Sequence, residues 1–191
     1  LKRLKPYSRQ DFLNLLFGKY ALFSRNRFYQ TVLKWFLNCL SQRDLFSLIH
    51  DKNLWGNSES VSGPGSTISE TKNIRAHLPE LFREFKIKSV LDIPCGDFNW
   101  MKIVEKDGID YIGADIVEEL ISQNREKYAS EHVKFKVLDL IQDPLPQAEL
   151  VLCRDGLVHL TDKEILKALK NIKRSGAKYL LMTTFTDHIE N

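Results

Sequence analysis

The sequence predicts an α/β fold, in which a helical extension precedes a doubly wound, mostly parallel sheet. From residue 86 onward, short apolar runs alternate with amphipathic stretches, a pattern typical of a parallel sheet with helices on both faces. With 43% hydrophobic and 28% charged residues, the chain can form a real core. Residues 1–50 hold nine Lys and Arg against two Asp and Glu, whereas the remainder holds 19 against 23. This asymmetry predicts a boundary near residue 50.

The segment 1–50 is predicted to be a basic helical extension or lid. Apolar residues recur at helical spacing over 8–23 and 28–41, so two helices are expected there. The basic side chains form either a solvated face or a surface for an acidic partner. No nucleic-acid-binding motif accompanies them, and nucleic acid is not an expected partner.

Residues 51–85 are predicted to be a loop and a helix that cover a ligand site. Positions 56–66 are rich in Gly and Ser and contain Pro64, so they cannot form a regular element. Either a linker or a functional loop has this composition, and Trp55 and the nearby Arg75 favour the functional loop. The following helix is expected to run from about residue 66 to residue 85, with an interruption at Pro79.

The core is predicted to occupy 86–191. Strands are expected over 89–93, 111–116, 133–140, 148–155 and 178–185, and helices over 98–106, 117–129 and 161–174. Thr161 and Glu164 form a capping box for the last helix. Sheets of this kind bind ligands beyond the carboxyl ends of their strands.

The first strand leads into an acidic turn, in "SVLDIPCGDFNWM" at 89–101. Gly96 lets a ligand approach the main chain. Asp115, 19 residues later, ends the second strand, where it either accepts hydrogen bonds from a ribose or caps a helix. A dinucleotide site needs more glycines and no carboxylate such as Asp92 beside the phosphates. A cationic ligand that has a ribose and no phosphate fits better, and S-adenosylmethionine is such a ligand.

These residues resemble the class I S-adenosylmethionine-dependent methyltransferases. Asp92, Pro94, Gly96 and Phe98 fall on the family's first motif, D/E-x-G-x-G-x-G, with Pro94 and Phe98 in place of glycines. The resemblance implies a Rossmann-like fold and S-adenosylmethionine as cofactor. It also implies an acid after the third strand near the adenine, and further contacts in "CRDGLVHL" after the fourth. The implied cofactor-binding residues in this core are Asp92, Pro94, Gly96, Phe98, Asp115, Ile116, Asp139, Leu140 and Arg154.

A finer likeness is to methyltransferase domains of multidomain proteins that build or decorate glycans. It implies a small-molecule or glycan acceptor and further domains in a longer polypeptide. It also implies that Trp55, Ser62, Gly63, Ser66 and Arg75 close over the cofactor, with Arg75 pairing with its carboxylate. Class I domains end with two strands beyond the fifth, and only "TDHIEN" remains here, so the C-terminal strands are expected to be missing.

Methyl transfer to an oxygen needs a base, and the predicted catalytic residues are Asp155 and His159. An imidazole with a pKa near 6.5 can accept a hydroxyl proton. Asp187 and His188 follow the fifth strand and are further candidates. A divalent cation held by Asp155, Asp187 and His188 is disfavoured, because no ligand spacing supports it, and no metal is predicted.

The predicted function is O-methylation of a hydroxyl on a sugar or glycan. The alternatives are a non-catalytic cofactor-binding module and a methyltransferase for a small molecule or a protein. A nicotinamide-dependent oxidoreductase is disfavoured by Asp92 and the scarcity of glycine. No run approaches the roughly 18 apolar residues of a membrane span. The three cysteines (Cys39, Cys95 and Cys153) are too far apart for a disulfide framework, which predicts a cytoplasmic location.

Overall fold

The computed structural model describes residues 40–183. The helix predicted over 8–23, nearly all of the one predicted over 28–41, and the pair Asp187 and His188 lie outside the described residues. Of the described residues, those from Phe46 to Thr183 belong to one compact unit. The first described helix is α3, Gln42–Asp51. Between residues 40 and 183, none of the helices has both the length and the apolar character that crossing a membrane requires.

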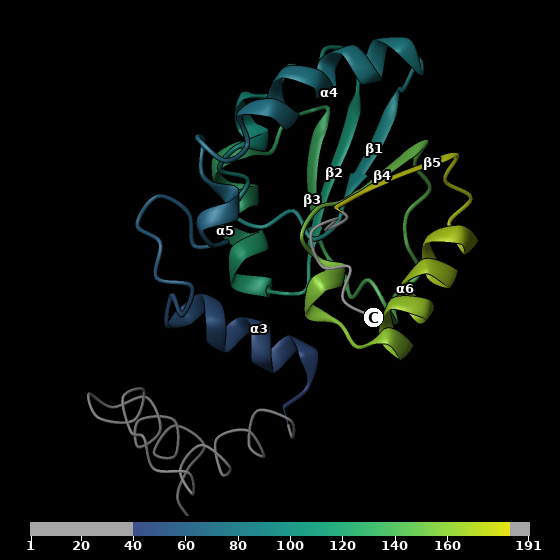
Figure 1. Cartoon of the computed structure of the whole chain (residues 1–191). Helices are drawn as coiled ribbons and strands as arrows, with labels where there is room; N and C mark the ends of the chain where they lie inside the picture. The colour runs from purple at the N-terminus through teal and green to yellow at the C-terminus, as the bar shows by residue number, and fades with distance from the viewer. Residues whose placement is uncertain (1–39, 184–191) are drawn as a thin grey trace, which may run out of the picture. The chain divides into compact units, whose positions relative to one another are not determined.

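Five parallel strands form one sheet in the order β3-β2-β1-β4-β5 (Figure 1). Their bounds are Ser89–Asp92 for β1, Asp110–Asp115 for β2, Val133–Val137 for β3, Leu150–Cys153 for β4 and Tyr179–Met182 for β5. All five predicted strands are confirmed, and with them the doubly wound α/β fold. The strand order reverses between β1 and β4, the place where open α/β sheets bind ligands.

The two faces of the sheet bury separate cores. Successive side chains of a strand point to opposite faces. Val90 and Tyr111 therefore lie in one cluster, with residues of α4 and α5, whereas Leu91 and Val151 lie in the other, with Ile172 of α6. Because both faces are covered, the central strands are apolar at nearly every position. Asp110 is exposed at the start of β2, whereas the buried acids Asp92 and Asp115 each stand at the carboxyl end of their strand.

Three helices flank the sheet, namely α4 (Lys72–Glu84), α5 (Glu118–Tyr128) and α6 (Asp162–Arg174). Figure 1 shows α5 beside β3 and α6 near β5. The predicted capping box of α6 is present, and the Thr161 backbone N–H donates to Glu164 Oε2 at 2.9 Å. The predicted interruption at Pro79 is wrong, because α4 continues through it. Leu78 and Phe82 on either side are buried in the core, which offsets the cost of about 3 kcal/mol for a proline within a helix.

The helix predicted over 98–106 is also wrong. Only a short 3₁₀ turn, η2 (Met101–Ile103), forms there. Phe98 has φ of 58°, a left-handed conformation that is incompatible with the start of an α-helix. The Lys106 ammonium then donates to the carbonyls of Met101 and Val104, the latter at 2.6 Å, and so satisfies acceptors that a longer helix would have used.

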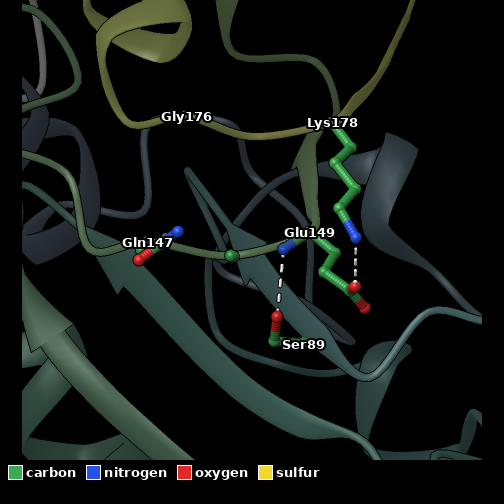
Figure 2. Close-up of a pocket in the computed structure, with 6 residues that line it drawn as sticks. Ser89, Gln147, Glu149, Gly176 and Lys178 are labelled. Carbon is green, nitrogen blue, oxygen red and sulfur yellow. Dashed lines mark hydrogen bonds and ion pairs between the residues drawn. The ribbon is translucent and has the colours of Figure 1, made fainter.

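Glu149 joins the amino ends of three strands (Figure 2). Its carboxylate pairs with Lys178 Nζ at 2.8 Å and accepts the Lys88 N–H at 2.7 Å, while its own N–H donates to Ser89 Oγ at 3.0 Å. A polar hollow of about 270 Å³ lies here, lined by Ser89, Gln147, Ala148, Glu149, Gly176 and Lys178. These contacts join the amino ends of the strands to one another. Ligands of such sheets bind at the opposite edge, beyond the carboxyl ends of the strands.

Candidate functional site

Asp92 is the most deeply buried carboxylate at the carboxyl edge, with 2% of its surface exposed. The Tyr111 hydroxyl donates to its Oδ2 at 2.6 Å, and none of the described residues donates to Oδ1. Burial raises the pKa of Asp92 to about 7; the Tyr111 hydrogen bond opposes that rise and the charge of Asp115 adds to it. One carboxylate oxygen is therefore available to a ligand at the end of β1.

The turn after β1 is held in place from two elements. The Gly96 N–H donates to Asp115 Oδ2 at 3.1 Å, and the Gly96 carbonyl accepts the Asn124 side-chain amide of α5 at 2.8 Å. Gly96 has φ of 57°, which favours glycine. Pro94 packs against Gly156, where an added Cβ would lie 2.4 Å from Pro94 Cδ. The stiff turn is thus built around two glycines, of which one is distant in sequence.

Asp115 accepts backbone hydrogen bonds from the N–H of Gly96 and of Val117, both at 3.1 Å, and the N–H of Ile116 also acts on its carboxylate. Since Val117 is itself the N-cap of α5, Asp115 does not cap the helix. Burial raises the pKa of Asp115, and the backbone hydrogen bonds that it accepts oppose the rise. A carboxylate can accept about four hydrogen bonds, so Asp115 keeps acceptor capacity for a ribose hydroxyl.

Phe98 does not present its side chain to the site. The ring is 3% exposed and packs against Tyr111, Tyr128 and Phe135, with ring centroids 5.3, 5.3 and 5.1 Å apart. The ring is therefore not placed for a ligand, and the expected cofactor contact of Phe98 stays a prediction for its backbone. Its φ of 58° is a conformation that favours glycine, and the buried ring contacts account for a phenylalanine at that position.

The Gly/Ser loop, which we define as residues 57–68, packs on this turn. Ser62 Oγ accepts the Asp97 N–H at 2.8 Å, and Asp97 Oδ2 accepts the Val61 N–H at 3.0 Å. A Cβ at Gly96 would lie 2.3 Å from Ser62 Oγ, so the missing side chain makes room for this loop. The segment is a packed loop and not a free linker.

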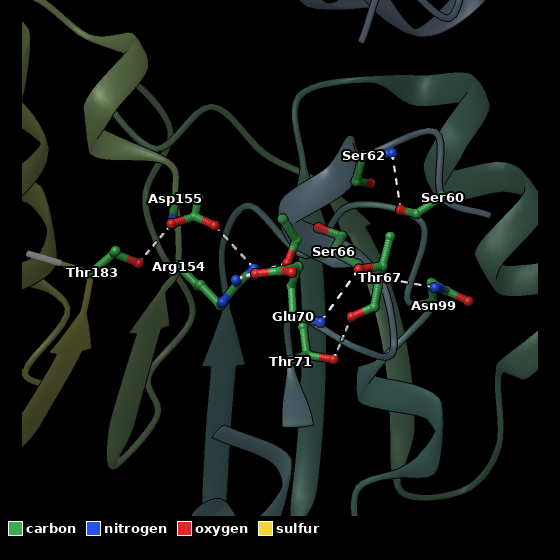
Figure 3. Close-up of polar contacts among 11 residues, drawn as sticks. Ser60, Ser62, Ser66, Thr67, Glu70, Thr71, Asn99, Arg154, Asp155 and Thr183 are labelled. Carbon is green, nitrogen blue, oxygen red and sulfur yellow. Dashed lines mark hydrogen bonds and ion pairs between the residues drawn. The ribbon is translucent and has the colours of Figure 1, made fainter. Parts of the chain in front are cut away.

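Asn99 makes a second attachment to the same loop (Figure 3). Its side-chain amide donates to Glu59 Oε1 at 2.9 Å and to the Ser66 carbonyl at 3.1 Å. Glu59 Oε1 also accepts the Ile68 N–H at 2.6 Å. Glu59 and Asn99 thus fix both ends of the Gly/Ser loop to the turn that follows β1.

Arg75 and Arg154 both donate hydrogen bonds to backbone carbonyls of the Gly/Ser loop. Arg75 donates to the Ile68 carbonyl at 2.7 Å and to Thr71 Oγ1 at 3.2 Å. Its guanidinium is thus engaged within the chain, and the structure does not support its expected pairing with a cofactor carboxylate. Arg154 donates to the Gly65 carbonyl at 2.8 Å and lies over the Trp100 ring at 5.6 Å. It therefore ties the loop to the end of β4.

The two predicted catalytic residues follow β4. Asp155 has φ of 53°, pairs with Arg154 at 3.0 Å and donates its N–H to Thr183 Oγ1 at 2.9 Å (Figure 3). His159 ends the 3₁₀ turn η3, Leu157–His159, and stacks on Trp55 with centroids 5.8 Å apart. Burial lowers the pKa of His159, and the nearby Asp155 carboxylate opposes that shift. The imidazole is therefore neutral near pH 7, as a proton acceptor must be.

The carboxylate of Asp139 accepts hydrogen bonds from the turn in which it lies. Its Oδ1 accepts the Ile141 N–H at 2.7 Å, and its Oδ2 accepts the Gln142 side-chain amide at 3.0 Å. The adjacent Leu140 carbonyl accepts from Asn171 of α6 at 2.9 Å. Asp139 and Leu140 thus shape the turn after β3, and an adenine contact there stays a prediction.

The sequence did not single out Tyr111, Asn99 or Asn124. Tyr111 pairs with Val90, and Asp92 with Gly113, so Tyr111 lies one pleat from Asp92 on the same face. This strand register is the signal that could have found Tyr111. From residue 40 to residue 183, no group of three or more His, Cys, Asp or Glu side chains is placed to hold a metal ion.

Residues 90–177 match a family model described as a methyltransferase domain. No curated protein sequence matches the chain. Among solved structures, the PH0226 protein from Pyrococcus horikoshii OT3 is 25% identical with a TM-score of 0.51, over 62% of this chain and 59% of that one. The chain thus spans less than two thirds of the length of that protein.

Two further structures share the fold at lower identity. Magnesium protoporphyrin IX methyltransferase (ChlM) from Synechocystis PCC 6803, solved with bound SAH, is 13% identical with a TM-score of 0.53, over 84% of this chain and 74% of that one. The [4+2]-cyclase SpnF is 18% identical with a TM-score of 0.54, over 71% of this chain and 56% of that one. One fold therefore hosts different reactions.

Proposed function

We propose that the chain is an S-adenosylmethionine-dependent methyltransferase, because residues 90–177 match a model described as a methyltransferase domain and the sheet has the class I strand order. The single observation that carries the proposal is the pair Asp92 and Asp115. They end neighbouring strands on either side of the Gly96 turn. Acids in this position disfavour a phosphate and suit a ligand with a positive charge and a ribose.

The donor and acceptor groups present fit this cofactor. Asp92 Oδ1 would accept from its ammonium and Asp115 from its ribose, while the Gly96 turn lets it lie against the main chain. S-adenosylmethionine, when bound, supplies a sulfonium methyl group for in-line displacement by an acceptor oxygen. The chain aligns the acceptor and excludes water.

The Gly/Ser loop would cover this site. It is attached to the turn through Ser62 and Glu59 and to β4 through Arg154. Its contacts reach the same turn that would touch the cofactor, so the loop both shapes the site and shields it from water. We retain Trp55, Ser62, Gly63 and Ser66 as cofactor-side residues of this cover.

His159 is the base that we favour. Its pKa is lowered by burial, and the Asp155 carboxylate stabilises the imidazolium that forms when the ring takes the acceptor proton. The Asp155 carboxylate itself is engaged in an ion pair with Arg154 at 3.0 Å. We therefore assign proton removal to His159 and electrostatic stabilisation of its imidazolium to Asp155.

We further propose a sugar or glycan hydroxyl as the acceptor. Two features support it: the likeness of the loop and turn sequences to glycan-modifying methyltransferase domains, and the exposed indole of Trp55 beside His159. An indole with one face accessible gives a sugar ring an apolar platform next to the base. Further domains in the same polypeptide would deliver such a substrate. Buried free thiols at Cys95 and Cys153 support a reducing, cytoplasmic setting.

A non-catalytic cofactor-binding module is the second candidate. It is favoured by the Arg154–Asp155 ion pair, which occupies one of the two predicted catalytic side chains. A methyltransferase for a small molecule or a protein would use the same cofactor site. It would differ from the proposed glycan enzyme only in the acceptor that reaches His159.

The test is transfer of a labelled methyl group. The protein is incubated with isotopically labelled S-adenosylmethionine and a panel of sugars, glycans, small alcohols and peptides, and the products are identified by mass spectrometry. A methylated sugar supports the full proposal. A methylated alcohol or peptide would instead assign the acceptor to small molecules or proteins. Cofactor binding without any product favours the non-catalytic module.

A further inference from the structure

Tyr111 is a buried residue that the catalytic scheme above does not use. Its hydroxyl donates to Asp92 Oδ2 at 2.6 Å, and its side chain is 1% exposed. The residue opposite Asp92 in β2 is Gly113, where an added Cβ would lie 2.8 Å from the Phe135 ring. The absence of a side chain at Gly113 therefore leaves the space beside Asp92 to aromatic rings.

Several charged or titratable groups act on Asp92 from the elements around it. They are Tyr111 and Asp115 of β2, Cys153 and Arg154 at the end of β4, Cys95 in the turn, and Lys106 after η2. Within the described residues only Tyr111 hydrogen-bonds to the carboxylate. Lys106 Nζ lies over the Phe98 and Tyr111 rings, 5.4 and 5.9 Å from their centroids, and its charge lowers the pKa of Asp92.

We propose that Tyr111 is a positioning residue for the cofactor, which favours the ionised form of the Asp92 carboxylate and leaves its Oδ1 to the cofactor ammonium. This inference rests on the proposed function, since it presumes that Asp92 meets that ammonium. The Tyr111 bond uses one acceptor position of Oδ2, and Oδ1 keeps both of its own for a ligand. The proton on Asp92 thereby becomes a switch for cofactor binding.

The direction of the switch follows from the ionised form being the one that binds. Burial puts the pKa of Asp92 at about 7, and a hydrogen bond donated to the carboxylate opposes that rise. Affinity is therefore greatest above pH 7 and falls as pH decreases through that value, by about tenfold for each further pH unit. Without the Tyr111 hydroxyl, the same fall should begin at a higher pH.

The experiment compares wild type with Tyr111→Phe, which removes the hydroxyl and keeps the ring. The affinity for S-adenosylhomocysteine is measured by calorimetry from about pH 5.5 to about pH 9. We expect the midpoint of the affinity loss to move up by about one to two pH units, with nearly wild-type affinity at the alkaline end. A loss of equal size at every pH would mean that Tyr111 only supports the fold, and would overturn the proposal.

Tyr128→Phe is the matched control. Tyr128 packs against the same Phe98 ring, with centroids 5.3 Å apart, and the structure shows no hydrogen bond from it to Asp92. Its midpoint should equal that of wild type, and a shift as large as that of Tyr111→Phe would contradict the proposal.

A second measurement needs no ligand. The carboxyl carbon of Asp92 is titrated by NMR in wild type and in Tyr111→Phe, with Asp92→Asn to assign the signal. An unchanged titration midpoint overturns the inference about Tyr111, even if S-adenosylhomocysteine binds. A shifted midpoint in a protein that does not bind S-adenosylhomocysteine supports the Tyr111–Asp92 link and contradicts the proposed function instead.

Discussion

Phe98 shows how one residue can satisfy two opposing demands. Its backbone takes a left-handed conformation with φ of 58°, which costs a non-glycine residue about 1–2 kcal/mol. Its ring is buried among Tyr111, Tyr128 and Phe135, and removing a ring from such a site costs about 3–5 kcal/mol. Packing thus outweighs strain.

Phe98→Ala and Phe98→Gly separate these two contributions. Both lose the ring and should destabilise the protein by several kcal/mol. Alanine keeps the backbone strain, whereas glycine relieves it, so Phe98→Gly should be more stable than Phe98→Ala by about 1 kcal/mol. Urea unfolding of the two variants measures the difference, and a more stable alanine variant would show that the left-handed backbone is not retained.

His159 should give the methyl-transfer rate its acid limb. The neutral imidazole is the active form, so turnover falls as pH decreases through the His159 pKa, which burial holds below its usual value. His159→Ala should lower turnover by about 10² or more and remove this limb. Rates are measured with the acceptor identified by mass spectrometry. An acid limb that persists in His159→Ala would assign it to another group.

Asp155→Asn provides the comparison at the neighbouring position. The Asp155 charge raises the pKa of His159, so its removal should move the acid limb to lower pH. If Asp155 were itself the base, the substitution would lower turnover at every pH by about 10² or more.

For single residues, the sequence predicted the place in the fold better than the direction in which the side chain points. Asp92 and Asp115 could be placed because each ends an apolar run, and the carboxyl ends of parallel strands meet at one edge. Arg75 and Phe98 could not, because a sequence motif does not say which way a side chain points. Arg75 turned to the Ile68 carbonyl, and Phe98 turned to the core.

The Gly/Ser loop is the element on which the site most depends. Its attachment needs a bare Cα at Gly96, since a Cβ there would lie 2.3 Å from Ser62 Oγ. The contact joins residues more than 30 positions apart in sequence, as in the bond from the Asp97 N–H to Ser62. Composition alone leaves this segment between a linker and a functional loop.

Gly96→Ala should displace the Gly/Ser loop from the turn. We expect weaker S-adenosylhomocysteine binding by about tenfold or more and faster proteolysis within 57–68. Gly108→Ala is the matched control, because Gly108 also has a positive φ of 69° but nothing lies within 4 Å of its added Cβ. Binding loss of equal size in both variants would mean that backbone strain, and not the loop contact, is responsible.

Regular elements were predictable where their signals were local. The capping box placed α6, and unbroken apolar runs placed the strands. The segment after β1 was wrongly predicted to be a helix. Its apolar residues Phe98, Trp100 and Met101, which are buried in the core, resemble the apolar face of a helix. Tertiary contacts decided it instead, through the left-handed Phe98 and the Lys106 ammonium on two backbone carbonyls.

At the scale of the whole molecule, the buried acids lie where the strand order predicts a ligand site. The switch between β1 and β4 brings together the ends of β1, β2 and β4, and two of these ends carry buried acids. The fold could be predicted because alternation of strands and helices leaves few topologies. The acceptor could not, because the fold is shared by proteins with different reactions and the acceptor side depends on exposed loops.

The central claim is that the acidic edge binds S-adenosylmethionine and not a dinucleotide. Its most direct test is calorimetry of the wild-type chain with S-adenosylhomocysteine and with NAD, repeated with Asp92→Asn. The account predicts binding of S-adenosylhomocysteine, no binding of NAD, and about tenfold or greater loss of affinity in Asp92→Asn. Binding of NAD without S-adenosylhomocysteine, or an Asp92→Asn variant with wild-type affinity, would contradict it.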